Sequence, residues 1–290
     1  MITILGIYSF MLLGFLAKKS FKDIDSKSFV LLSTYFLQPF LTLWGIMLVP
    51  LNSNLVLSPL LYLLAVFVSL IFTYMLSISL KDKKERVIAT LTPLIGNTGN
   101  LGIPLSYMLF GDLGASIATL INLANVFFIY SFGIFFFASG KYDFKNSFRK
   151  IIKIPIIWVG IIAILLNFFH IQFNNEVMKI LQMGAFASMV IQLIIFGLYV
   201  ADINLKEITL KLSFITSINK FIVFPLIGYI VLTLFNVDKL YFKAIMIEIL
   251  TPLAVSNVNL AALFDLYPQK VSFLIILTSF LFIFIFFLLS

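Results

Sequence analysis

Long apolar runs follow one another along almost the whole chain and are separated by short polar segments. A bilayer core about 30 Å thick needs roughly 20 mainly apolar residues per helix, and the runs have about that length. The pattern predicts ten membrane-spanning helices, near residues 2–17, 28–49, 55–80, 87–110, 113–138, 154–170, 177–200, 209–235, 241–264 and 271–289. The connections between these helices are too short to hold a soluble domain.

Composition agrees with this pattern. The chain has 290 residues, of which 62% are hydrophobic and 11% charged, and its mean hydropathy is +1.13. A soluble domain carries about a quarter charged residues, so we expect a multi-pass protein of the cell membrane rather than an aqueous enzyme. With no Cys and a single His, thiolate chemistry and a His-cluster metal site are excluded. We therefore expect no enzyme, no metal and no cofactor.

The basic residues give an orientation. They gather in alternate connections such as "KKSFKDIDSK", "KDKKER" and "GKYDFKNSFRKIIK", whereas "PLNSN" and "GDLG" contain none. The positive-inside rule places the basic connections in the cytoplasm, which leaves both termini on the outside. The net charge of +8 is then mainly a topology signal, and no nucleic-acid partner is expected.

The ten spans divide into five and five. Because each half has an odd number of spans, two repeats would have to be inverted. The segments "TPLIGNTGNL" (92–101) and "TPLAVSNVNL" (251–260) match at five positions and lie in the fourth and ninth spans, which correspond under a five-span repeat. A second register aligns "MLFGDL" (108–113) with "ALFDL" (262–266), so the residue register stays open. We expect repeats at 1–140 and 154–290, joined by a cytoplasmic linker at 141–153.

The stretch "LTPLIGNTGNLGIPLSYMLFG" places glycine, proline and asparagine inside the fourth apolar run. Glycine and proline interrupt helices, and non-helical backbone at membrane depth is tolerated only where protein buries it or where it lines a watery cavity. One interrupted span per inverted repeat is typical of secondary transporters. We expect the chain to unwind between about Gly96 and Pro104 and to cross a matching break near Ser256–Asn259. The alternative is that the glycines only let helices pack closely.

The crossing supplies most of the candidate binding residues. Half-helix ends and free backbone groups form a polar site, and asparagine side chains add donors and acceptors. The candidates from the first break are Asn97, Thr98, Asn100, Gly102 and Pro104, and those from the second are Ser256, Asn257 and Asn259.

At these residues the sequence resembles the auxin efflux carrier family, which includes plant auxin exporters and bacterial permeases. "GNTGNLGIPL" resembles the fourth-span motif of that family, "TPLAVSNVNLAALFDLYPQ" its ninth-span segment, and "YFLQPFLTLWGI" its proline-containing second span. The resemblance covers the whole chain in span count and order. Two departures stand out: the central connection is short, and "VSNVN" lacks the Pro of plant members, so that Asn257 stands near the second crossing. The second departure weighs against plant-type auxin specificity.

The resemblance implies an all-α fold of ten helices in two inverted five-helix repeats, as in sodium–proton antiporters and bile-acid symporters. It implies a scaffold domain from spans one, two, six and seven, and a transport domain from spans three, four, five, eight, nine and ten. The fourth and ninth spans would cross as broken helices. Members of the family carry organic anions, including auxin in plants and dicarboxylates such as malate and malonate in bacteria.

Several polar residues lie inside other spans. Lys220 lies roughly 13 Å deep in the eighth span, where it would balance charge at the crossing or attract an anion, or else extend its amine to the interface. Glu248 would carry a coupling proton or pair with Lys220, or else lie at the outer interface. The fifth span carries a stripe that either packs against a helix or faces the crossing: Ser116, Thr119, Asn122 and Asn125. From the scaffold side, Gln38 and Gln192 could line the substrate path.

The sequence therefore predicts a secondary active or facilitative transporter of small organic anions that works by an elevator or rocking movement, with H⁺ or Na⁺ as coupling ion. The alternative within transporters is a sodium-coupled protein of bile-acid-symporter type. A channel is disfavoured because no ring of like charges or repeated filter loop is visible. An intramembrane enzyme is disfavoured because no nucleophile–base set is visible. A homodimer through an apolar scaffold surface is the one protein partner expected.

Overall fold

The computed structural model describes residues 2–21, 23–133, 154–201 and 209–289, and this part of the chain is helical almost throughout. Its first stretch contains α1 (Ile2–Ser20), α2 (Ser26–Leu32), η1 (Ser33–Leu37), α3 (Gln38–Met47), α4 (Ser53–Ser77), α5 (Lys83–Leu91), η2 (Thr92–Leu94), η3 (Thr98–Gly102), α6 (Ile103–Phe128) and η4 (Ile129–Gly133). The remainder contains α9 (Pro155–Phe168), α10 (Asn175–Ala201), α11 (Leu210–Ile218), η6 (Asn219–Val223), α12 (Phe224–Leu234), α13 (Lys239–Leu250), α14 (Ser256–Leu263) and α15 (Pro268–Leu289).

Six helical segments in the described residues are long and apolar enough to cross a membrane: Ser26–Met47, Ser53–Ser77, Thr98–Gly133, Asn175–Ala201, Leu210–Leu234 and Pro268–Phe287. The predicted all-helical, multi-pass membrane protein is thus confirmed. Helix occupies each of the ten predicted ranges, although the fifth (113–138) runs beyond the described residues. In the sixth range, α9 has only 14 residues, about 21 Å of helix, which is shorter than the bilayer core.

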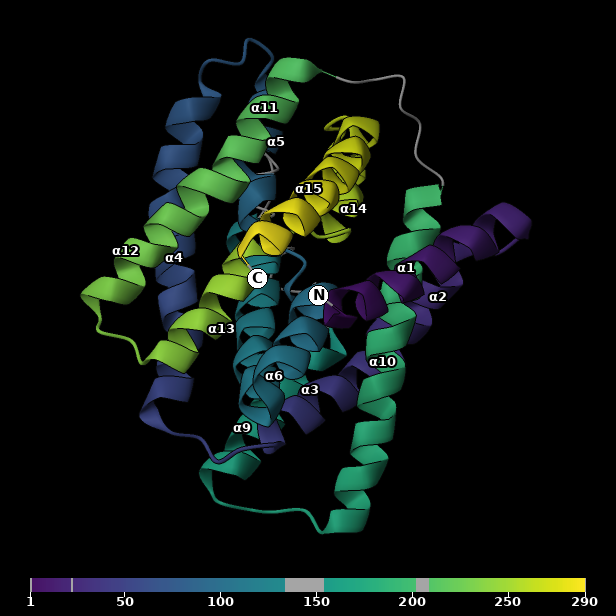
Figure 1. Cartoon of the computed structure of the whole chain (residues 1–290), viewed down its shortest axis with the longest axis vertical. Helices are drawn as coiled ribbons and strands as arrows, with labels where there is room; N and C mark the ends of the chain where they lie inside the picture. The colour runs from purple at the N-terminus through teal and green to yellow at the C-terminus, as the bar shows by residue number, and fades with distance from the viewer. Residues whose placement is uncertain (1, 22, 134–153, 202–208, 290) are drawn as a thin grey trace.

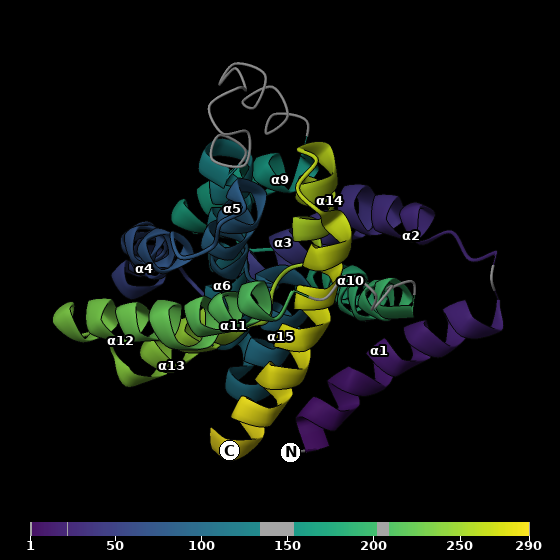
Figure 2. The ribbon, with the colours of Figure 1, turned by 90° about the horizontal axis from the view of Figure 1, so that it is seen from above.

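The helices form two groups that lie side by side. In Figures 1 and 2, α1, α2 and α10 lie on one flank, and α4, α11, α12 and α13 lie on the other. The first flank is continued by α3 and α9, because α10 packs on α3 and α3 packs on α9. Between the flanks stands α6, which contacts α3 and α9 on one side and α4 and α13 on the other.

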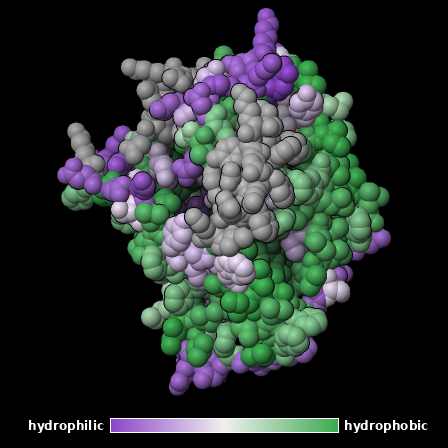
Figure 3. Space-filling view, turned by 180° about the vertical axis from the view of Figure 1, so that it is seen from behind, coloured by the Kyte–Doolittle hydropathy of each residue, from purple (hydrophilic) through white to green (hydrophobic). Residues whose placement is uncertain are grey.

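The surface has the polarity of a membrane protein. In the view of Figure 3 apolar residues cover the right side and much of the lower half of the described surface, and hydrophilic residues gather at the top, at the upper left and at the bottom. Large apolar side chains are exposed on several long helices, for example Ile71 on α4 and Met183 on α10. Lipid, rather than water, is the solvent in which such a surface is stable.

Three of the helices change from π to α geometry just before a proline. The N–H groups of Gln38, Ile103 and Phe224 each donate to the carbonyl oxygen five residues earlier, and Pro39, Pro104 and Pro225 follow directly. A proline in a helix has no N–H to donate, and its ring clashes with the carbonyl of residue i−4. A wider π-helical turn accommodates both defects, so the second, fourth and eighth spans continue past their prolines.

The fourth span is interrupted, but earlier and more briefly than the sequence predicts. Helix η2 ends at Leu94, and Ile95 has φ −101° and ψ 79°, outside helical geometry. Thr98–Gly102 is a π-helical turn that leads directly into α6, so the predicted unwinding as far as Pro104 is wrong. The physical reason is that a π-helical turn tolerates the proline without loss of the helix.

The break of the ninth span also lies earlier than predicted. Helix α13 ends at Leu250 and α14 begins at Ser256, so the break spans 251–255, and the predicted position at Ser256–Asn259 is wrong. Pro252 explains the shift, because the residue before a proline is driven out of the helical region. Thr251 accordingly has φ −49° and ψ 141°.

Gly111 separates the fourth span from the fifth. Its φ of 63° and ψ of −148° produce a kink within α6, at the "GDLG" connection where the sequence predicts a turn. Glycine is suited to this position because it adopts positive φ without a steric cost.

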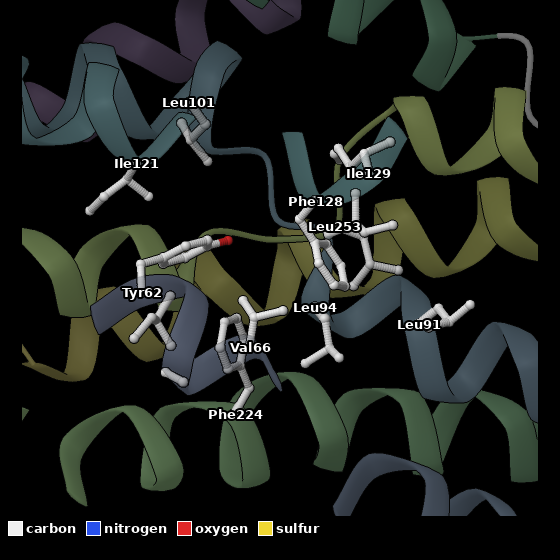
Figure 4. Close-up of a cluster of buried hydrophobic side chains, with 14 of the residues drawn as sticks. Tyr62, Val66, Leu91, Leu94, Leu101, Ile121, Phe128, Ile129, Phe224 and Leu253 are labelled. Carbon is white, nitrogen blue, oxygen red and sulfur yellow. The ribbon is translucent and has the colours of Figure 1, made fainter. Parts of the chain in front are cut away.

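The hydrophobic core surrounds the two breaks. Figure 4 shows Leu94, the last residue of η2 before the first break, and Leu253 of the second break beside Phe128 at the end of α6. The ring of Tyr62 on α4 packs edge-on against Phe224, with ring centroids 6.0 Å apart. These side chains are almost completely buried, so the polar backbone of the breaks is held within protein rather than exposed to lipid.

Candidate functional site at the crossing of two broken helices

The two breaks cross and hydrogen-bond to each other. Gly96 and Leu253 form an antiparallel bridge, which is the one β-type pairing in the described residues. The N–H of Asn97 donates to the Pro252 carbonyl at 2.8 Å, and the N–H of Ala254 donates to the Ile95 carbonyl at 2.9 Å. Backbone N–H and C=O groups with no partner in their own helix thus hydrogen-bond to the other break. These bonds lower the free-energy cost of non-helical backbone at this depth.

Two buried asparagines hold the crossing in place. Asn125 on α6 donates through Nδ2 to the Gly96 carbonyl and to Thr98 Oγ1, both at 3.0 Å. Asn257 on α14 donates through Nδ2 to the Ile95 carbonyl at 3.0 Å. The Thr98 hydroxyl in turn donates to Asn122 Oδ1 at 3.0 Å. These amides fix the conformation of the first break from two directions.

A cavity of about 270 Å³ opens beside the crossing. Eight of the residues predicted for the site line it: Gln38, Asn97, Thr98, Asn100, Asn122, Asn125, Ser256 and Asn259. The remaining five do not line it: Gly102, Pro104, Lys220, Glu248 and Asn257. The sequence-based set therefore separates into residues that face the cavity and residues that support the crossing behind it.

The polar stripe of the fifth span serves both of the roles weighed from the sequence. Ser116 donates to the Gly45 carbonyl at 2.6 Å, which joins α6 to α3. Thr119 also packs on Gly45, since a Cβ atom there would come within 3.0 Å of its Cβ. Asn122 and Asn125 instead face the cavity. One end of the stripe packs helices together, and the other end reaches the crossing.

The opposite wall of the cavity comes from η1, from Gln38 at the start of α3 and from α10. Gln38 donates through Nε2 to Gln192 Oε1 at 3.3 Å, and Gln192 donates to Ser188 Oγ at 2.7 Å. Both glutamines line the cavity, so the polar wall of the crossing faces a second amide pair. Sequence reasoning missed several further lining residues, namely Ser33, Thr34, Tyr35, Tyr130 and Tyr199. A tyrosine in a membrane helix is usually an interface residue, so its sequence position gave no signal for a cavity.

Lys220 is completely buried behind the crossing. Its Nζ donates to the Pro93 carbonyl at 3.0 Å and lies 5.1 Å from the centre of the Phe224 ring. A Cβ atom added at Gly96 would lie 3.2 Å from this Nζ, so the amine is close to the first break. The Lys220 amine thus sits where the first half-helix ends, the end that carries partial negative charge.

Glu248 is also completely buried, one turn before the second break. Its Oε1 accepts a hydrogen bond from the Ser106 hydroxyl at 2.8 Å, whereas its Oε2 has no hydrogen-bond partner among the described residues. Lys220 interacts with it electrostatically, but the two side chains do not form an ion pair within 4.0 Å. The position at the outer interface that was weighed from the sequence does not fit this burial.

The residues that line the cavity are all uncharged in the part of the chain described here. Its donors are amide and hydroxyl side chains and the N–H groups at the start of η3. The first N–H groups of a helix have no acceptor within that helix and carry partial positive charge. This environment is suited to a small anion that is held by hydrogen bonds rather than by a fixed cation.

Comparisons with known proteins agree with this architecture. A family model described as "Membrane transport protein" matches residues 1–290. An uncharacterised transporter of Methanocaldococcus jannaschii is 29% identical over 206 residues, a match that covers 69% of this chain and 66% of the relative, slightly less than two thirds of its length. The chain therefore belongs to the membrane transport protein family, the family of the auxin efflux carriers.

Proposed function

We propose that this protein is a secondary active or facilitative transporter that moves small organic anions, dicarboxylates or auxin-like carboxylates, across the cell membrane. The observation that carries this proposal is the cavity at the crossing of two broken helices. The N-terminus of η3 and asparagine amides converge there, and both can donate hydrogen bonds to a carboxylate. The second amide pair, Gln38 and Gln192, would bind the other end of a bifunctional anion.

Movement of the site would occur by an elevator or rocking displacement between the two helix groups. The proposed scaffold consists of α1, α2–α3, α9 and α10, and the proposed transport domain contains the remaining helices. Support for this division comes from packing: Gly14 and Gly197 bring the backbones of α1 and α10 into direct contact, as close-packed membrane helices do. The cavity lies between the groups, with the crossing on one side and the Gln38–Gln192 pair on the other.

The two halves are proposed to be inverted repeats, 1–140 and 154–290. The hydrogen bonds of the crossing are reciprocal, because the N–H of Asn97 reaches Pro252 while the N–H of Ala254 reaches Ile95. A two-fold axis through the bridge would exchange 95–97 with 252–254. The offset between the residues paired in this way is intermediate between the offsets of the two sequence alignments. The pairing therefore supports the repeat from backbone geometry alone, without an appeal to matching residue types.

Orientation and assembly are also part of the proposal. The positive-inside rule supports termini on the outside of the cell membrane. A homodimer would use the scaffold surface, where Trp158, Ile162 and Leu165 of α9 are exposed. Chemical cross-linking in native membranes tests the dimer, and a monomeric band under conditions that cross-link a known dimer would contradict it.

The function is tested by ligand-dependent stability and by uptake. Purified protein is heated with malonate, malate and indole-3-acetate at two pH values, with and without sodium, and the same acids are offered to proteoliposomes. We expect at least one acid to raise the melting temperature and to enter the vesicles, and Asn259→Ala to weaken both effects while the remote Gln172→Ala does not. If no carboxylate stabilises the protein or enters the vesicles, the proposal is wrong. An absolute requirement for sodium would favour the bile-acid-symporter-like alternative.

A further inference from the structure

We infer that Glu248 is the proton-binding site that couples this transporter to H⁺, an inference that rests on the proposed transport function and names its coupling ion. The observation is geometric. Glu248 and Lys220 are both fully buried at the crossing, neither lines the cavity, and they do not pair with each other. The two residues contact different broken helices. Glu248 is part of α13, whereas the Lys220 amine donates to a carbonyl at the end of η2.

The surroundings of Glu248 indicate which of its states this structure represents. Ser106 on α6 donates to Oε1, and the α-carbon of Gly102 lies against the carboxyl group. Tyr62 on α4 and Lys220 on η6 are the titratable groups that interact with it electrostatically. The Tyr62 hydroxyl and Glu248 Oε2 are both without a hydrogen-bond partner among the described residues. A carboxylate removed from water without a paired cation is strongly disfavoured, so this arrangement fits the neutral acid with its proton on Oε2.

Loss of that proton would change the crossing. The proton passes from Oε2 to water, and the carboxylate that remains attracts the Lys220 ammonium. The Lys220 Nζ is held at present by the Pro93 carbonyl and stands beside Gly96. Movement of the amine toward Glu248 would release the end of the first half-helix and shift Gly96, which lines the cavity. Protonation behind the crossing and anion binding in front of it would thereby be coupled.

Sodium is a poorer fit to this position. Sodium binding requires several oxygen ligands, whereas Ser106 is the one side chain among the described residues that hydrogen-bonds the Glu248 carboxyl group. The buried Lys220 amine would also repel a cation placed at the carboxyl group.

The proton itself can be observed without knowledge of the substrate. Infrared difference spectra between acid and alkaline pH detect the carbonyl stretch of a protonated carboxylic acid. We expect purified wild-type protein to show a band of this kind that Glu248→Gln removes and Ser106→Ala shifts, because Ser106 donates to the carboxyl group. Asp112→Asn is the matched control, since this side chain is exposed at the Gly111 kink. A wild-type band that persists unchanged in Glu248→Gln overturns the inference.

Uptake measurements separate this inference from the proposed function. In proteoliposomes with an imposed pH gradient, we expect wild-type accumulation of malonate, malate or indole-3-acetate to follow the gradient, and Glu248→Gln to retain exchange but lose the pH response. Equal pH responses of the two proteins would overturn the proton site and leave the transport function standing. A Glu248-dependent infrared band in a protein that moves none of these anions would instead contradict the transport function. Melting curves of Glu248→Gln and the wild type provide the control that the variant is folded.

Discussion

The carboxyl group of Glu248 lies directly against the α-carbon of Gly102, where an added Cβ atom would come within 2.6 Å of Glu248 Cδ. The sequence placed Gly102 among the candidate binding residues of the first break. The structure gives a different reason for this glycine, because the neighbour is a side chain from the first half of the other broken helix.

Gly102→Ala is therefore expected to lower the melting temperature, because overpacking of a buried site costs about 1–3 kcal/mol. The matched control is Gly6→Ala, at a position where no atom lies within 4 Å of an added Cβ. Glu248→Ala removes the group that clashes, so the double variant should lose less stability than the sum of the two single variants. Additive losses in thermal unfolding, or a Gly102→Ala protein as stable as Gly6→Ala, would show that the contact does not constrain this glycine.

Asn125 and Asn259 should differ in what they contribute. Asn125 is buried and binds the Gly96 carbonyl and Thr98, whereas Asn259 is exposed and lines the cavity. We expect Asn125→Ala to lower the melting temperature and to abolish anion uptake, since it leaves a buried backbone carbonyl without its donor, at a cost of about 1–3 kcal/mol. Asn259→Ala should weaken uptake with little change in melting temperature. Equal melting temperatures for the two variants would contradict the distinction between Asn125, which also holds the first break, and Asn259, which only lines the cavity.

Lys220→Met should weaken anion binding at least tenfold, which corresponds to about 1.4 kcal/mol, although Lys220 does not line the cavity. The reason is indirect: the Pro93 carbonyl loses its charged donor, and the first break loses a fixed point beside Gly96. Lys211→Met is the control, because Lys211 belongs to the same span and is exposed. Binding is measured by ligand-dependent melting. An unchanged affinity in Lys220→Met would mean that the amine has only a packing role.

The sequence predicts the architecture well because the membrane restricts it strongly. Apolar runs of helical length give the spans, and glycine, proline and asparagine in an apolar run indicate broken helices. The exact positions of the breaks are harder to predict. They depend on whether a proline is absorbed by a π-helical turn, as at Pro104, or ends a helix, as at Pro252. Both prolines look alike in the sequence, and only tertiary packing distinguishes them.

The same limit applies to the site. Polar residues in the fourth, fifth and ninth spans were recognised because they are unusual at membrane depth. Which of them face the cavity could not be predicted, because that depends on helix rotation. Asn257, for example, faces the first break rather than the cavity, while its near neighbour Asn259 faces the cavity. The tyrosines at 35, 130 and 199 could not be distinguished by sequence from interface residues.

The proposed orientation predicts a labelling pattern. The chain contains no cysteine, so single cysteines at Ser53 and Lys83, both exposed, can be probed one at a time. An impermeant thiol reagent added to intact cells should label the cysteine at position 53 and should label the one at position 83 only after the membrane is opened. The reverse pattern would place the termini in the cytoplasm.

The hydrogen bonds of Asp82 predict that the folded protein loses stability in acid. It caps α5 by accepting from the N–H of Lys84 at 2.7 Å, and the Tyr267 hydroxyl donates to it at 2.8 Å. Partial desolvation raises the pKa of Asp82, but the hydrogen bonds from Tyr267 and the backbone outweigh this and leave the pKa below its ordinary value. The unfolded chain therefore binds this proton more readily than the folded chain does. The stabilisation is present above the ordinary aspartate pKa and is lost as the pH falls through the lowered pKa of the folded state.

The measurement is the melting temperature from about pH 7 to about pH 3, across the ordinary aspartate pKa. Asp82→Asn keeps a residue that caps helices but cannot titrate, so its melting temperature should fall less steeply in acid than that of the wild type. Tyr267→Phe should move the wild-type loss to higher pH, because it removes the hydrogen bond that lowers the pKa of Asp82 most. Asp112→Asn, at an exposed position, serves as the charge control. If Asp82→Asn follows the wild-type curve throughout, the contacts of Asp82 do not stabilise the folded protein.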